Sequence, residues 1–98
     1  MDMQQDIRRE EQNGRGRYVL AMSDGQEAYL RFQRSSPDNI VIDYSFVPPA
    51  DRGRGVAAML ILRAVQDARE AQTTITPTCG YVVAEFRRHA EWTDVLKR

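Results

Sequence analysis

The feature that most constrains the fold is a turn of alternating arginine and glycine that joins a strand-like segment to a helix-like segment. Residues 40–47 are mostly apolar, two prolines and the turn at 51–55 follow, and residues 56–71 contain neither Gly nor Pro. The start of such a helix presents backbone N–H groups without intrahelical partners, and the helix dipole adds positive potential there. We therefore predict a strand–turn–helix unit whose turn can bind an anion such as phosphate.

The first half of the sequence alternates in the manner of strands and is divided by turn residues. The turn residues are Asn13-Gly14, Asp24-Gly25 and Pro37-Asp38-Asn39. They separate four predicted strands, at residues 5–12, 17–22, 28–32 and 40–46. Because each connection is short, we expect the four strands to form an antiparallel meander.

The second half adds two helices and one strand. Residues 56–71 have good helix propensity and an apolar stripe at helical spacing, made of Val56, Leu60, Ala64, Ala68 and Ala71. Residues 73–76 are rich in β-branched side chains, and a strand after a helix crossover is most simply parallel to the strand before it. A second helix is expected from Thr78 or Cys79 to about His89, with a short turn at 92–96. The order ββββ-α-β-α predicts an α+β fold in one domain, residues 1–98, with helices packed on a mixed sheet.

Composition and charge exclude several functional classes. The 98 residues suffice for one domain, and 14 basic side chains balance 14 acidic ones, so we expect no nucleic-acid partner. No apolar run approaches the length that spans a bilayer, and the first residues lack a secretory signal. These patterns predict a cytoplasmic protein without a membrane partner. One cysteine and one histidine offer no metal-ligand spacing, so no metal site is expected.

The turn has the pattern Arg52-x-x-Gly55-x-Ala57, which fits neither a Walker loop nor a dinucleotide fingerprint. It resembles the [Gln/Arg]-x-x-Gly-x-[Gly/Ala] loop with which acetyltransferases of the GNAT superfamily bind the pyrophosphate of acetyl-coenzyme A. The resemblance covers about residues 40–92 and includes two further motifs, Cys79-x-Tyr81-Val82 and Arg88-His89-x-Glu91-Trp92. The chain looks like a short branch of N-acetyltransferases in that superfamily, which implies a GNAT-like fold and acetyl-coenzyme A as cofactor.

The resemblance also implies where the cofactor binds. The pyrophosphate would lie against backbone N–H groups of the turn, in Gly53, Arg54, Gly55, Val56 and Ala57. The side chains of Arg52 and Arg54 would add charge-assisted hydrogen bonds, and glycine at 53 and 55 would let the backbone approach closely. Pantetheine and the thioester carbonyl would contact backbone groups at the end of the fourth strand, in Tyr44, Ser45, Phe46 and Val47. Without the resemblance, an ordinary turn with no ligand is the simpler interpretation.

Three side chains are candidates for catalysis: Asp43, Cys79 and Tyr81. Asp43 is either a base that takes a proton from an incoming ammonium or a solvated strand carboxylate. Strand alternation places Asp43 and Ser45 on one face of the sheet and Ile42, Tyr44 and Phe46 on the other. Related short sequences carry histidine where Tyr44 stands, so a histidine base is not carried over to this chain.

The proton donor of the resembled family is missing. In many GNAT enzymes a tyrosine protonates the departing thiolate, and the pattern aligned on Cys79 puts Phe86 at that position. Phenylalanine has no proton to donate, so this catalysis is lost or passes to Cys79 or Tyr81. Cys79 near a helix start is alternatively an acyl acceptor or a buried structural thiol. His89 is expected to cap or pack a helix end.

Three functions are consistent with these residues. The first is transfer of an acetyl group from acetyl-coenzyme A to an amine of a protein, a peptide or a small molecule, by direct attack on the thioester. The second is a non-catalytic module that binds coenzyme A or acyl-coenzyme A, and the third is an RNA-interacting domain. Zero net charge and the absence of paired exposed aromatic residues disfavour the third. Asn13-Gly14 replaces a helical segment of longer family members, so the acceptor site is open in a monomer or completed by a second subunit in a homodimer.

Overall fold

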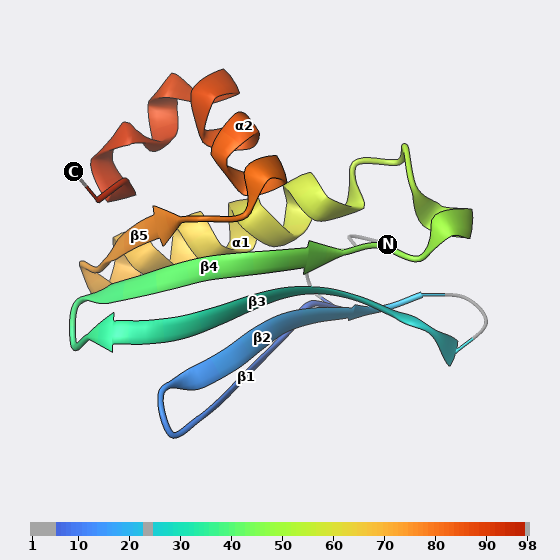
Figure 1. Ribbon diagram of the computed structural model, residues 1–98, viewed down its shortest axis with the longest axis horizontal. Helices are drawn as coiled ribbons and strands as arrows, with labels where there is room; N and C mark the ends of the chain where they lie inside the picture. The colour runs from blue at the N-terminus through green and yellow to red at the C-terminus, as the bar shows by residue number, and fades with distance from the viewer. Residues whose placement is uncertain (1–5, 23–24, 98) are drawn as a thin grey trace.

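The computed structural model describes residues 6–22 and 25–97 and consists of a sheet with helices on one face and at one edge (Figure 1). The strands are β1 (Arg8–Gln12), β2 (Arg15–Ala21), β3 (Glu27–Ser36), β4 (Asn39–Phe46) and β5 (Thr74–Pro77). The helices are α1 (Val56–Ala71), α2 (Gly80–Arg88) and the 3-10 segments η3 (Pro49–Asp51) and η4 (Ala90–Val95). The strands lie in chain order, the first four antiparallel and β5 parallel to β4. The predicted α+β order ββββ-α-β-α and mixed sheet are confirmed.

The hairpin turn between β1 and β2 has the predicted geometry. Asn13 and Gly14 have φ values of 56° and 77°, the left-handed conformation that a two-residue hairpin requires and that Asn and Gly tolerate. The predicted turn at Asp24-Gly25 falls partly outside the described residues, as does the start of the predicted first strand. β3 runs to Ser36, beyond its predicted end at residue 32, because it pairs with β4 along its whole second half.

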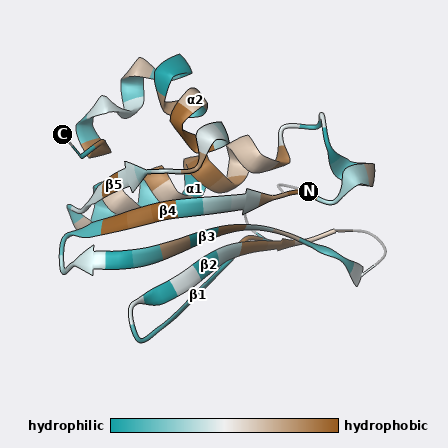
Figure 2. Ribbon diagram, in the orientation of Figure 1, coloured by the Kyte–Doolittle hydropathy of each residue, from teal (hydrophilic) through white to brown (hydrophobic). Residues whose placement is uncertain are grey.

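The core lies between the sheet and α1. Val56, Leu60, Ala64 and Ala68 of the predicted stripe are buried, whereas Ala71 at the helix end is exposed. Ile42 of β4 and Phe32 of β3 contribute to the same core from the sheet. Figure 2 shows the first half of β4 as hydrophobic and the tip of the β1–β2 hairpin as hydrophilic. No described helix is long and apolar enough to cross a membrane.

The C-terminal part of the chain packs at the β5 edge. Val82, Phe86, Trp92 and Val95 join the hydrophobic core. Leu96 forms a parallel bridge with Ile75, and the N–H of Lys97 donates to the Ile75 carbonyl oxygen at 2.9 Å. Arg69 of α1 binds both carboxylate oxygens of Asp94, at 2.8 and 2.9 Å. These contacts hold η4 against α1 and position α2 beside the end of β4.

Candidate functional site

A cleft of about 490 Å³ lies where the end of β4, the glycine turn and α2 meet. Its lining residues come from three segments, namely Tyr44, Ser45, Phe46 and Val47; Asp51, Arg52, Gly53, Gly55, Val56 and Ala57; and Tyr81. Nearly all the residues that the sequence predicts for cofactor binding therefore lie together. Arg54 is exposed and does not line the cleft.

The cleft exists because β5 leaves β4 after four paired residues. The last pair is Ile42 with Pro77, and the N–H groups of Thr78 and Cys79 then both donate to the Ile42 carbonyl oxygen, at 3.0 and 3.3 Å. From residue 43 onward, β4 has no β5 residue on that side. Backbone groups along a strand edge need partners, so this edge can bind an extended ligand.

A bulge at Asp43 changes which faces the β4 side chains occupy. Tyr44 pairs with Arg31, whereas Ile42 pairs with Phe32, so Asp43 is an extra residue on β4. A bulge shifts the alternation of a strand by one residue. The predicted sharing of one face is therefore wrong for Ile42, whereas Tyr44 and Phe46 do share a face and both pack near Tyr29. Ile42 is buried in the core, while Tyr44 is 41% exposed, with 6.0 Å between its ring centroid and that of Tyr29.

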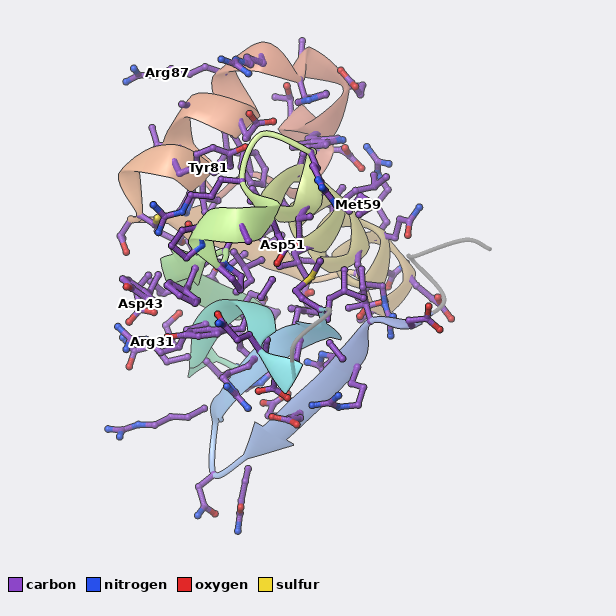
Figure 3. All side chains as sticks on the ribbon, turned by 90° about the vertical axis from the view of Figure 1, so that its right-hand side faces the viewer. Arg31, Asp43, Asp51, Met59, Tyr81 and Arg87 are labelled. Atoms are coloured by element: carbon purple, nitrogen blue, oxygen red, sulfur yellow. The ribbon has the colours of Figure 1, made fainter. Side chains whose placement is uncertain are left out.

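Asp43 lies outside the cleft, and its predicted pairing with Ser45 on one face is also wrong. Its carboxylate accepts hydrogen bonds from Arg31, at 3.0 Å from Nε and 3.5 Å from Nη2, and lines a separate depression of about 940 Å³. Figure 3 shows Arg31 and Asp43 close together on the side of the sheet away from α1. Ser45 instead contacts Cys79 at the start of α2. The bulge therefore places Asp43 and Ser45 in different surroundings.

The two glycines of the turn have left-handed backbone conformations. Gly53 and Gly55 have φ values of 82° and 76°, a left-handed region that other residues adopt only with strain. Apart from the glycine itself and its chain neighbours, no atom of the described residues lies within 4 Å of a Cβ built on either glycine, so both positions face open space. The Nε of Arg52 donates to the Val47 carbonyl oxygen at 2.9 Å and ties the turn to the end of β4.

The start of α1 supplies donors next to this open space. Gly55 is the N-cap residue and makes no side-chain capping bond. The first intrahelical bond runs from the N–H of Met59 to the Gly55 carbonyl oxygen, at 3.1 Å. The N–H groups of the first turn precede that bond and lack intrahelical acceptors. Together with the helix dipole they favour an anion at the cleft wall.

Cys79 precedes α2 as its N-cap residue, and its sulfur lies 3.4 Å from the Ser45 hydroxyl oxygen. Partial burial raises the pKa of the thiol, but hydrogen bonds from the Ser45 side chain and from backbone N–H groups of Val82 and Tyr81 outweigh this effect. The pKa of Cys79 is therefore lowered from its ordinary value. A lowered thiol pKa favours the thiolate, which is the nucleophilic form.

Tyr81 extends from the first turn of α2 into the cleft lining, with 46% of the residue exposed. Partial burial raises its pKa, the charge of Glu85 adds to the rise, and Arg88 opposes it. The phenol is therefore protonated at neutral pH and has a proton to donate. Figure 3 shows Tyr81 on α2 beside the ribbon of the glycine turn.

Phe86 and His89 lie away from the cleft. Phe86 is buried and meets Trp92 edge to face, with 5.5 Å between ring centroids. His89 is the C-cap residue of α2, stacks on Trp92 at 3.9 Å, and places its Nδ1 2.9 Å from Glu91. The residue aligned with the family's tyrosine is thus a core residue, and His89 has the packing position expected of it.

Sequence reasoning missed Asp51, which is buried in the cleft lining. An aspartate side chain in the lining can accept hydrogen bonds from N–H or O–H groups of a ligand. The sequence feature that could have indicated Asp51 is its acidic side chain next to the arginines of the turn. Among residues 6–22 and 25–97 there is no grouping of three or more potential metal ligands.

Comparisons with known proteins agree with this geometry. A family model described as GCN5-related N-acetyl-transferase matches residues 17–95. The solution structure of a GCN5-like protein from Staphylococcus aureus superposes with a TM-score of 0.66 over 94% of this chain and 89% of that one, at 16% sequence identity. At that identity the likeness concerns the fold. A search among curated proteins gives no significant match.

Proposed function

Because this chain belongs to the GCN5-related N-acetyltransferase family, we propose that it transfers an acetyl group from acetyl-coenzyme A to an amine in the cytoplasm. The observation that carries the proposal is the juxtaposition of two features in one cleft. One is the β4 edge that β5 leaves free after Ile42, and the other is the glycine turn at the start of α1. The acceptor is a protein, a peptide or a small molecule, and the chain acts as a monomer or a homodimer.

The residues present fit acetyl-coenzyme A. The turn from Gly53 to Ala57 offers backbone N–H groups beside open space that a Cβ at Gly53 or Gly55 would enter. That cradle suits the pyrophosphate, and the free edge of β4 suits the amide groups of pantetheine. The side chain of Asp51 would accept a hydrogen bond from an N–H or O–H group of the cofactor.

The chemistry needs the amine nitrogen to bond to the thioester carbonyl carbon, the carbon–sulfur bond to break, and one proton to pass from nitrogen to the departing sulfur. Tyr81 holds a proton in the cleft and is the proposed donor to that sulfur. Cys79 is the proposed alternative donor or a transient acyl acceptor, and its lowered pKa favours the acceptor role. Asp43 lies outside the cleft and binds Arg31, so no base role is proposed for it. The proton lost by the amine nitrogen would replace the one that Tyr81 gives to the sulfur.

Replacement of Gly55 by Asp tests the binding site. The new carboxylate would project into open space, so the fold should persist, while its charge should repel phosphate and abolish binding of coenzyme A in a calorimetric titration. Gly25→Asp is the matched control, since Gly25 has a φ of 73° and equally open surroundings but does not line the cleft. Unchanged affinity in folded Gly55→Asp would refute the site.

Cys79→Ala tests the role of the thiol. An acyl acceptor predicts one acetyl mass on the wild type that hydroxylamine removes, and loss of turnover with retained cofactor affinity in the variant. Equal turnover in both proteins on an identified acceptor would rule out an essential thiol.

A non-catalytic module that binds acyl-coenzyme A is the second candidate function. The observation that favours it concerns Phe86, which is aligned with the proton-donating tyrosine of the family. Phe86 has no hydroxyl group and is buried against Trp92. Mass spectrometry of peptides and polyamines incubated with acetyl-coenzyme A separates the two functions. Binding without acetylation of any amine would support the module.

A further inference from the structure

Ser45 and Cys79 meet at the point where β4 and β5 separate, although 34 residues lie between them in the sequence. The main chain of Cys79 is held there by its N–H, which donates to the Ile42 carbonyl oxygen. Main-chain anchoring leaves the rotation of a cysteine side chain free, so the direction of the sulfur needs a further contact. The Ser45 hydroxyl, 3.4 Å from the sulfur, makes a side-chain contact of this kind, in addition to the backbone N–H groups of Tyr81 and Val82.

We propose that Ser45 is a positioning residue whose hydroxyl directs the Cys79 sulfur at the divergence of β4 and β5 and donates a hydrogen bond to the sulfur when it is ionised. When Cys79 is a thiol, either atom can donate the hydrogen bond. When it is a thiolate, only Ser45 can donate, and a hydrogen bond to a charged acceptor is stronger than a neutral one. The contact therefore strengthens as the thiol ionises.

Hydrogen bonds, rather than charged side chains, govern this thiol. The leading contributions to its pKa are burial, the Ser45 hydroxyl and nearby backbone groups, with no charged residue among them. The ionisable groups on the packed elements are engaged elsewhere or open to the cleft. Asp43 of β4 binds Arg31, Glu85 of α2 binds Arg88, and Tyr81 lines the cleft.

The proposal rests on the proposed function for its purpose, since a directed thiolate matters only if the acetyl group lies nearby. It also changes the role that the sequence suggests for Ser45. The cofactor would use the backbone of this residue, whereas its hydroxyl belongs to Cys79. The side chain and the main chain of one residue then have separate tasks.

The test uses the alkylation of Cys79 by iodoacetamide as a function of pH, which reports on one group because the chain has a single cysteine. Ser45→Ala should raise the midpoint of the profile by about one pH unit, the value of one hydrogen bond to a charged group. Ser45→Thr keeps the hydroxyl and should restore the wild-type midpoint. Thr78→Val is the matched control, because it removes a neighbouring hydroxyl that contacts the Ile42 carbonyl oxygen at 3.4 Å.

A wild-type midpoint in Ser45→Ala that retains its circular dichroism spectrum would overturn the proposal, as would equal shifts in Ser45→Ala and Thr78→Val. Alkylation requires neither acetyl-coenzyme A nor an acceptor, so it is independent of the proposed function. Protection of wild-type Cys79 by acetyl-coenzyme A tests that function separately. Lack of protection with a shifted Ser45→Ala midpoint would count against the cofactor site and leave the role of Ser45 supported.

Discussion

From Asn39 to Ile42, β4 has a strand on each side and buries Ile40 and Ile42 in the core. From Asp43 to Phe46, the same strand has lost β5, contains the bulge residue and exposes Tyr44. The first half satisfies its backbone within the sheet, and the second half leaves one edge for a ligand. The candidate site begins where regular strand pairing ends, so stability and binding should respond to different residues of one strand.

The largest expected effect comes from the paired half. Ile42→Ala should lower the free energy of unfolding by about 2–5 kcal/mol, because it opens a cavity in the core. Tyr44→Ala, two residues away and half exposed, should cost less than about 1 kcal/mol. Urea denaturation of both variants measures the difference. Equal losses of unfolding free energy in the two variants would show that both halves of β4 contribute alike to stability.

Alkaline pH should lower the free energy of unfolding through Tyr18, whose hydroxyl donates to Asp67 of α1. Burial raises the pKa of Tyr18 to about 12, and the charge of Asp67, which accepts its hydroxyl at 2.9 Å, adds to the rise. The unfolded chain loses this proton near pH 10, so below that pH the stabilisation is complete. As pH rises from about 10 to 12, the free energy of unfolding should fall by about 2–3 kcal/mol.

Tyr18→Phe provides the control for the alkaline effect. The variant lacks the titrating group, so it should lose about 2–3 kcal/mol less than the wild type over the same interval. Other groups titrate in both proteins, and their contribution cancels in the difference. Parallel curves of unfolding free energy against pH would show that Tyr18 does not ionise differently in the folded state.

Substitution of a glycine in the turn should have a small effect on stability and a separate effect on coenzyme A binding. Gly53→Ala places a Cβ on a residue with φ of 82° and should cost about 1 kcal/mol of stability. Gly25→Ala, with φ of 73°, should cost a similar amount. Only Gly53→Ala should weaken coenzyme A binding, by about tenfold if one hydrogen bond is lost. Calorimetry that finds equal affinities for the two variants would remove Gly53 from the site.

The smallest expected change in stability concerns the bulge residue. Asp43→Asn breaks an exposed ion pair with Arg31 and should cost less than about 1 kcal/mol, decreasing further with added salt. Thermal unfolding at two salt concentrations measures this. The same variant should leave acetyl transfer unchanged, because Asp43 lies outside the cleft. A larger stability loss would mean that the pair organises the unpaired half of β4.

Local patterns predicted the parts of the fold that depend on local interactions. The helix over residues 56–71 has no internal breaker and begins at Gly55, so its predicted bounds agree with those of α1. The parallel pairing of β5 follows from the crossover through that helix, and the Asn13-Gly14 turn fixes the first hairpin. The glycine turn also lies at the cleft, because its position after a strand and before a helix determines where it must be.

Nonlocal interactions determine what the sequence did not reveal. The segment 40–46 reads as one alternating strand, and only its pairing with β3 creates the bulge that separates Tyr44 from Ile42. The contact of Ser45 with Cys79 joins segments 34 residues apart. Phe86 could be aligned with a catalytic tyrosine, but its burial depends on Trp92 and the path of the terminal segment.

The terminal segment also covers part of one outer edge of the sheet. Leu96 and Lys97 run beside Ile75, so part of the outer edge of β5 already has a partner. The opposite edge is β1, whose residues are all exposed and mostly charged. Covered or charged edges discourage the addition of strands from neighbouring molecules, which is a route to aggregation. The chain can therefore leave one strand edge open inside its cleft without offering an outer edge for growth of the sheet.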